Sequence, residues 1–175
     1  MRIENLVEEY LDIVDENDNV IDKDTRENIW KRGLKHNVRV VNILIFNTKD
    51  KLLLPKRSMN RRIFPGCFDF SCGEHVLTGE NYYDAAIRGL KEELGIVDIK
   101  LIELGKLTPK EDVSCFMKVY QLTYDGEINN YDKNGIDNLF WYDLSAVKQM
   151  VGKDKSKFKG DFPIVLDWYI KKFRK

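Results

Sequence analysis

Residues 73–96, with the sequence GEHVLTGENYYDAAIRGLKEELGI, constrain the fold of this chain more than any other stretch. They combine a turn at residues 78–80, a helix and a helix stop in one continuous segment. Gly95 lies just beyond the last periodic apolar residue, where a glycine commonly ends a helix. The apolar residues recur at i, i+3, i+4, i+7 and i+11, which places them on one stripe facing a core; they are Tyr83, Ala86, Ile87, Leu90 and Leu94.

The charged residues of this predicted helix lie away from its apolar stripe. Glu92 and Glu93 are adjacent, and Arg88 precedes them by about one helical turn. Two neighbouring carboxylates on a stiff element, close to a loop of backbone carbonyls, suit a hard divalent cation such as Mg²⁺. The segment therefore predicts a metal site.

The same segment resembles the Nudix box, whose pattern is G-x5-E-x7-R-E-U-x-E-E-x-G-U, with U a bulky aliphatic residue. Two of its positions differ here, since Glu74 stands at the first glycine and Gly89 at the first glutamate of R-E-U-x-E-E. Seven of the nine defining positions match in register: Glu80, Arg88, Leu90, Glu92, Glu93, Gly95 and Ile96. The resemblance implies a Nudix α/β/α sandwich, an α+β fold with a mixed central sheet.

The resemblance also implies roles for individual residues. Glu92 and Glu93 would be catalytic residues that bind Mg²⁺ or Mn²⁺, and the carbonyl of Gly73 could complete the coordination. Glu80 would assist them or orient Arg88, so both of these residues are structural support for the site.

Gly89 is the departure with the largest consequence, because the family carboxylate at this position binds metal and can serve as base. A glycine inside a helix also costs about 1 kcal/mol relative to alanine. One interpretation is drift in a disused site, or a packing need for a small residue. The other is a working site that uses another carboxylate, for which Glu74 in the adjacent loop is the catalytic candidate.

Four basic residues, Lys56, Arg57, Arg61 and Arg62, precede the box within seven positions. Such a cluster is usually a solvated loop. Beside a metal site it could bind a diphosphate, since arginine holds phosphate oxygens bidentately. Arg57 and Arg61 are the predicted substrate-binding residues.

The run from Pro65-Gly66 to His75 resembles the Nudix branch that contains isopentenyl-diphosphate isomerase and its hydrolase-like relatives, and the similarity covers roughly residues 5 to 150. Counting without gaps places Gly73 at the catalytic cysteine of the isomerase, which Cys72 misses by one position. His75 falls on that enzyme's metal-ligand histidine, and we include it among the candidate substrate-binding residues.

Two further isomerase features are absent. No glutamate stands in register at residues 113–117, and Gly135 replaces a glutamate that often lies six residues before the tryptophan corresponding to Trp141. Asp132 and Asp137 are nearby but out of register, and we expect both to be solvated. The isomerase is therefore a minority interpretation.

Composition excludes several classes of protein. The 175 residues suit a single domain over 1–175, and the 29 basic and 29 acidic residues cancel. This balance gives no reason to expect a nucleic acid polymer or a membrane as partner. Three cysteines, without metal spacing, indicate free thiols in a reducing cytoplasm, so we expect a cytoplasmic protein. A homodimer is possible, because dimers are the commonest symmetric assembly.

Periodicity and turn signals predict the remaining elements. Pro55 suggests an edge or bulge at the end of the strand that starts at residue 52. Residues 153–159 are expected to be a flexible basic surface loop. We expect an N-terminal hairpin at 5–24, a short helix at 26–34, strands at 38–46, 52–54, 97–104, 116–124 and 139–142, a polar loop at 105–112, and helices at 143–150 and 162–173.

These features lead to one main functional prediction and two alternatives. The first is metal-dependent hydrolysis of a diphosphate linkage in a nucleoside diphosphate or related small molecule, with Mg²⁺ or Mn²⁺ as cofactor. The second is a catalytically impaired Nudix-fold protein that binds a nucleotide or diphosphate, motivated by the glycines at 89 and 135. The third is isopentenyl-diphosphate isomerase.

Overall fold

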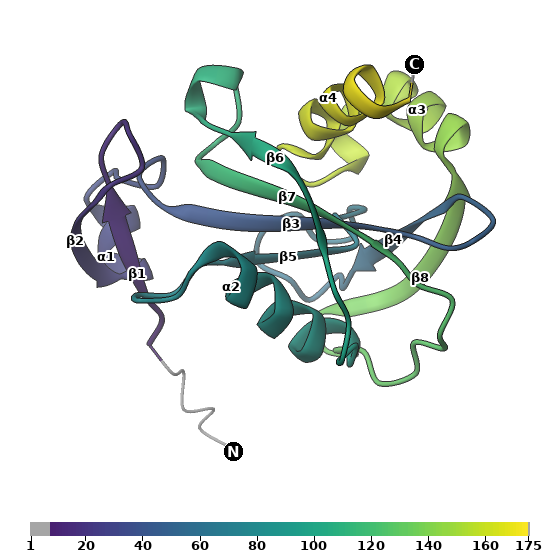
Figure 1. The fold of residues 1–175 in the computed structure, drawn as a ribbon, viewed down its shortest axis with the longest axis horizontal. Helices are drawn as coiled ribbons and strands as arrows, with labels where there is room; N and C mark the ends of the chain where they lie inside the picture. The colour runs from purple at the N-terminus through teal and green to yellow at the C-terminus, as the bar shows by residue number, and fades with distance from the viewer. Residues whose placement is uncertain (1–7, 175) are drawn as a thin grey trace.

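The computed structural model describes residues 8–174 and shows a mixed sheet with helices on both faces (Figure 1). Helix α2 covers one face, and α3 and α4 cover the other, while a two-stranded hairpin and α1 lie at one end. The strands are β1 (Tyr10–Val14), β2 (Val20–Thr25), β3 (Arg39–Phe46), β4 (Lys51–Arg57), β5 (Cys72–His75), β6 (Ile102–Leu107), β7 (Phe116–Thr123) and β8 (Ile136–Asp143).

The α-helices are α1 (Arg26–Lys31), α2 (Tyr82–Gly89), α3 (Leu144–Lys153) and α4 (Phe162–Phe173). A π-helical turn, Leu90–Leu94, continues α2, and two 3₁₀ turns span Pro109–Glu111 and Lys155–Lys157. The predicted α+β architecture, with a mixed central sheet between helices and an N-terminal hairpin, is therefore confirmed. Residues 5–7 of the predicted hairpin lie outside the described residues.

Strand β3 is the centre of the sheet, whose order is β6-β7-β3-β4-β8. It pairs in parallel with β7 along its whole length, from Arg39↔Phe116 to Phe46↔Thr123. Its other edge is divided, because β5 occupies the first half and β4 pairs only at Phe46↔Leu52. Strands β3 and β4 therefore diverge, and β5 is inserted where the functional segment begins.

At Pro55, β4 is paired with β8 through Pro55↔Leu139 but no longer with β3. The proline is tolerated because β4 has already left β3 on its other side. A register shift follows between Lys56 and Arg57, which agrees with the alternative of a bulge.

Separate apolar clusters fill the two faces of the sheet. The cluster beneath α3 and α4 includes Leu54, Phe162 and Tyr169, and the one beneath α2 includes Ile43, Leu90 and Cys72. Most of the predicted α2 stripe is buried in the second cluster, although Tyr83 is 38% exposed. Both layers thus depend on the nearly continuous apolar sequence of β3.

Three predicted elements were wrong in extent. Residues 97–101 form no strand; β6 begins at Ile102 and runs into the expected polar loop, because its pairing with β7 overrides weak local propensity. Strand β8 starts three residues before the predicted one. Residues 153–159 are not a flexible loop, since Phe158 is buried and stacks on Phe162 with ring centroids 5.1 Å apart.

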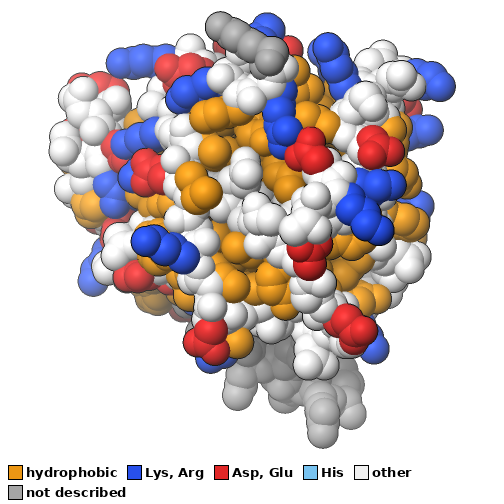
Figure 2. Space-filling model, turned by 45° about the vertical axis from the view of Figure 1, so that its right-hand side comes forward, with side chains coloured by type: hydrophobic (Ala, Val, Ile, Leu, Met, Phe, Trp, Pro, Cys, Tyr) orange, Lys and Arg blue, Asp and Glu red, His pale blue; other side chains and the backbone are white. Residues whose placement is uncertain are grey.

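Side chains of both charge signs are interspersed on the face drawn in Figure 2, as the balanced composition predicts. No helix within residues 8–174 combines the length and apolar character needed to span a bilayer.

Candidate functional site

The segment that carries the box is held by caps at both ends. The side chain of Asn81 accepts a hydrogen bond from the backbone N–H of Asp84 at the start of α2 (2.9 Å). Gly95 ends the π-helical turn with a φ of 67°, a left-handed conformation that favours glycine. The positions of Glu92 and Glu93 therefore follow from a short, well-terminated element.

Gly89 provides the space that Glu74 occupies. A Cβ atom built at Gly89 would lie 2.4 Å from Cγ of Glu74 and 3.2 Å from Sγ of Cys72. Even the Cβ atom of an alanine does not fit there while Glu74 keeps its position. The two departures from the box pattern are thus complementary: the carboxylate missing from the helix is replaced by one reaching the same space from β5.

The carboxyl groups of Glu74 and Glu93 lie close enough for each to affect the pKa of the other. Enclosure by protein raises the pKa of Glu93 well above its usual range, and the negative charges of Glu74 and Asp69 add to the effect. Enclosure also raises the pKa of Glu74, although the charge of Arg88 opposes the shift. Such crowded like charges are typical of sites that hold a proton or a cation.

Arg88 connects the surrounding acids. Its Nε and one terminal nitrogen donate to the two carboxylate oxygens of Glu80 (2.9 and 3.1 Å), and it also donates to the carbonyl of His75 (2.8 Å). Contacts of 3.4 Å to Glu74 and 3.3 Å to Glu92 complete its partners. This geometry fits the predicted supporting role of Glu80 and Arg88.

Glu92 occupies a different environment from Glu93. Its side chain is 58% exposed and pairs with Arg88 on the outer side of the helix. Within residues 8–174, no group of three histidine, cysteine, aspartate or glutamate side chains is arranged to hold a metal ion. The predicted metal role of Glu92 stays a prediction.

The donor chemistry nevertheless suits a hard cation. Glu74 and Glu93 supply carboxylate oxygens, and their mutual repulsion is a cost that a bound cation would relieve. Mg²⁺ is commonly held by one or two carboxylates and completes its shell with water and substrate phosphates. Two facing carboxylates therefore meet that requirement without a third.

Arg57 is occupied by the loop that follows it. Its guanidinium donates to the carbonyls of Ile63 (2.8 Å) and Phe64 (3.1 Å) and to the carboxylate of Asp69 (2.8 Å), and the side chain is 14% exposed. These bonds fix the loop beside the site. The predicted contact of Arg57 with substrate remains untested.

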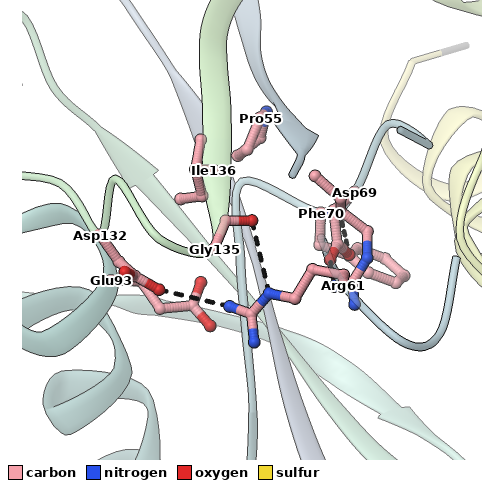
Figure 3. A pocket seen from close by; sticks show the side chains of 9 residues that line it. Pro55, Arg61, Asp69, Phe70, Glu93, Asp132, Gly135 and Ile136 are labelled. Carbon is pink, nitrogen blue, oxygen red and sulfur yellow. Dashed lines mark hydrogen bonds and ion pairs between the residues drawn. The ribbon is translucent and has the colours of Figure 1, made fainter. Parts of the chain in front are cut away.

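Arg61 extends across Gly135 toward Asp132 (Figure 3). Its terminal nitrogen lies 3.3 Å from the carboxylate of Asp132, and it is more exposed than Arg57. A Cβ atom at Gly135 would lie 1.9 Å from this arginine and 2.3 Å from Asp132. Gly135 thus clears the space for the arginine and its partner, and a larger residue would displace them.

Sequence reasoning missed three charged residues of the site. Asp69 pairs with Arg57 and Lys159 and contributes to the raised pKa of Glu93. Asp132, expected to be solvated, lines the same small pocket as Glu93 (Figure 3). Lys159 was assigned to a surface loop, but it lines the main cavity. Their proximity arises from tertiary contacts. The apolar Phe158 within the basic run 153–159 was a local signal that this segment is anchored, which could have placed Lys159.

The main cavity has a volume of about 690 Å³ and opens beside the carboxylate pair. Gly73 and His75 line it, whereas Cys72 is fully buried in the cluster beneath α2. Within the described residues, the thiol of Cys72 is buried against Gly89 and is not part of the cavity lining. The position that corresponds to the isomerase cysteine is a glycine on the cavity side.

The comparisons with known proteins agree with this geometry. The NUDIX domain family matches residues 36–162. The chain belongs to the Nudix family. An uncharacterised Nudix hydrolase from Nostoc sp. is 45% identical over 149 residues, which cover 83% of this chain and 86% of the relative.

A solved structure and an isomerase relative extend this assignment. The crystal structure of DR0079 from Deinococcus radiodurans has a TM-score of 0.85 and 29% identity, covering 95% of this chain and all of that one. Isopentenyl-diphosphate Delta-isomerase 1 from Mesocricetus auratus is 31% identical, over 96% of this chain and 85% of its own. This Nudix chain is thus similar to proteins of both the hydrolase and isomerase branches.

Proposed function

We propose that this Nudix protein hydrolyses a diphosphate linkage in a nucleoside diphosphate or related small molecule, with Mg²⁺ or Mn²⁺ as cofactor. The observation that carries the proposal is the facing pair Glu74 and Glu93, for which Gly89 leaves room. A carboxylate lost by drift would not be replaced by another in the same space. The exchange favours a retained site over a disused one.

Each residue of the site has a role in this reaction. Glu74 and Glu93 hold the ion, which when bound neutralises phosphate oxygens and lowers the pKa of a coordinated water. Glu74 lies in the space of the missing helix carboxylate and is therefore the candidate to accept the proton of the attacking water. Arg88 keeps Glu74 in place from its other side.

Cations at the cavity hold the diphosphate. Arg61 and Lys159 are each only partly buried, and each contacts one aspartate, so they retain donors for phosphate oxygens. Asp132 and Asp69 orient these two side chains. Arg61 and Lys159 both line the cavity together with Glu93. Their positive charges could surround the phosphate oxygens from several sides, which in-line transfer of a phosphoryl group requires.

The test is turnover of purified protein with Mg²⁺ or Mn²⁺ and a panel of nucleoside diphosphate conjugates. Wild-type protein should release phosphate-ester products, and chelation with EDTA should abolish the release. Glu93→Gln and Glu74→Gln should each lower kcat about 100-fold or more. Glu103→Gln, an exposed carboxylate on β6 paired with Lys118, is the matched control and should leave kcat unchanged.

Two outcomes favour the alternatives. Binding of a nucleotide without turnover would favour the binding protein, which the lack of three convergent metal-ligand side chains in residues 8–174 supports. Conversion of isopentenyl diphosphate to its allylic isomer would favour the isomerase, against the placement of Gly73 and Cys72.

A further inference from the structure

The N-terminal hairpin of β1 and β2 precedes residues 36–162, the part of the chain that matches the family, yet it lies beside the loop that leads into α2 (Figure 1). The carbonyl of Tyr10 accepts a hydrogen bond from the backbone N–H of Thr78 (2.9 Å). The carboxylate of Asp12 accepts one from the backbone N–H of Gly79 (3.2 Å). The hairpin therefore supports the turn from which the box helix starts.

The tip of the hairpin makes a second, more enclosed contact. Asp18 has a φ of 66°, a left-handed conformation that aspartate tolerates in turns, and its side chain is only 7% exposed. The carboxylate accepts hydrogen bonds from Nε of Arg39 (2.6 Å), from the hydroxyl of Tyr82 (2.9 Å) and from Nζ of Lys106. One side chain thus joins the hairpin to β3, to β6 and to the first residue of α2.

The ring of Tyr82 lies among cations that this carboxylate balances. Lys106 and Lys118 place their ammonium groups 5.8 and 5.4 Å from the ring centroid, and they are direct partners on β6 and β7, where like charges repel. Glu103 pairs with Lys118 (3.0 Å), but it is 47% exposed, so solvent screens this pair. Removal of the Asp18 charge would therefore restore repulsion next to the start of α2.

Asp18 is ionised in spite of its enclosure. Enclosure by protein opposes ionisation, but the hydrogen bonds from Lys106, Arg39 and Tyr82 bring the pKa of Asp18 below its ordinary 3.8. Enclosure and the charge of Asp18 raise the pKa of Tyr82, so its hydroxyl remains a donor. At neutral pH the contact is thus a charged one.

This contact is linked to the carboxylate site through a short series of residues. Tyr82 begins α2, and Glu80 precedes it by two residues. Glu80 accepts a hydrogen bond from Nε of Arg88 (2.9 Å), and Arg88 in turn lies 3.4 Å from the carboxylate of Glu74. The two hairpin contacts therefore hold the turn and the helix start that place Glu80 and Arg88.

We infer that Asp18 is a positioning residue for the carboxylate site, because it fixes the start of α2 through Tyr82 and thereby the placement of Arg88 against Glu74. Reacting groups must be held within about 0.5 Å of their working geometry. A misplacement of about 1 Å that arises far from the reacting atoms can cost about 100-fold in rate. This role rests on the proposed hydrolysis, to which it adds a residue from outside the family-matched range.

The first experiment compares Asp18→Asn with wild type at a temperature where both are folded, since the amide keeps the shape of the side chain but not its charge. We expect kcat for a nucleoside diphosphate conjugate to fall about 10-fold, and the Mg²⁺ concentration for half-maximal activity to rise by a similar factor. KM should stay unchanged, because Arg61 and Lys159 lie on other elements. An unchanged kcat, or a lower kcat with an unchanged Mg²⁺ requirement, would overturn the inference.

Two further variants test the route through α2. Tyr82→Phe removes only the hydroxyl that bonds to Asp18, and it should raise the Mg²⁺ requirement in the same direction by a smaller factor, about 3-fold. Kinetics of Tyr82→Phe identical to wild type would overturn the assigned route. Asp22→Asn is the matched control, because this hairpin carboxylate is 54% exposed and pairs only with Arg32 (3.5 Å) among the described residues, so it should change neither kcat nor the Mg²⁺ requirement.

The second experiment needs neither turnover nor metal. Hydrogen exchange of the metal-free full-length protein, followed by mass spectrometry, should be about 10-fold faster for the amides of residues 77–84 in Asp18→Asn, with wild-type rates in α4. Unchanged exchange at 77–84, or an equal increase along the whole chain, would overturn the inference. Absent hydrolysis by wild type would overturn the proposed function alone, because faster exchange confined to 77–84 would still support the link between the hairpin and α2.

Discussion

The two faces of the central sheet are packed in different ways. Beneath α3 and α4 the interior is made of rings, such as the pairs Phe158–Phe162 and Phe46–Tyr169. Beneath α2 the apolar cluster ends at Glu74 and Glu93, two carboxyl groups crowded together with only partial compensation by Arg88. The first face is filled by packed apolar groups, whereas the second retains an electrostatic cost that the proposed metal site would relieve.

Leu90→Ala should have the largest effect, because it changes both stability and chemistry. Leu90 is fully buried and begins the π-helical turn that carries Glu93. The free energy of unfolding should fall by about 2–5 kcal/mol. Displacement of Glu93 should also lower kcat/KM of the folded protein about 10- to 100-fold. Urea denaturation and kinetics on the same samples measure both, and a loss of stability alone would contradict this account.

Leu166→Ala is the matched change on the opposite face. Leu166 is 3% exposed within the cluster beneath α4. We expect a similar loss in free energy of unfolding, about 2–5 kcal/mol, with kcat/KM of the folded fraction unchanged. A fall in kcat/KM comparable to that of Leu90→Ala would show that the two faces are not separate in function.

Glu93→Gln should stabilise the protein while it abolishes turnover. The folded pKa of Glu93 is raised above its ordinary 4.5, so its ionisation opposes folding. When the pH is below the pKa of Glu93 in the unfolded chain, the side chain is neutral in both states. As the pH rises from there toward the pKa in the folded protein, the stability of the wild type falls.

The gain in Tm from Glu93→Gln should therefore be greatest at neutral and alkaline pH and vanish near pH 4. Each kcal/mol corresponds to about 2–4 °C for a protein of this size. Thermal unfolding between pH 4 and pH 8, without divalent metal, measures the difference. A Tm below that of wild type at neutral pH would mean that the carboxylate stabilises the fold.

The sequence predicted the segments whose structure is locally determined. The glycine stop after α2, the strand at β3 and the C-terminal helix follow from periodicity and from glycine and proline positions. The complementary departures at Glu74 and Gly89 were also visible, because a fixed pattern defines both positions. The two interpretations of Gly89 could be weighed only once the structure gave the distance between this position and Glu74.

The rest of the site depends on tertiary contacts that no local pattern encodes. Asp69 and Asp132 come from loops that precede β5 and β8, and they meet Glu93 only because β3 and β4 diverge. Lys159 reaches the cavity because Phe158 is anchored in the aromatic face.

The most direct measurement is kcat/KM for variants at the two positions that differ from the Nudix box. These variants are Gly89→Glu, Glu74→Gly and the double variant. Gly89→Glu alone places a Cβ atom 2.4 Å from Cγ of Glu74, and Glu74→Gly alone removes a carboxylate. Each single change should lower kcat/KM about 100-fold or more, and the double variant should recover most of it. Losses that simply add in the double variant would show that Glu74 does not take the place of the missing helix carboxylate.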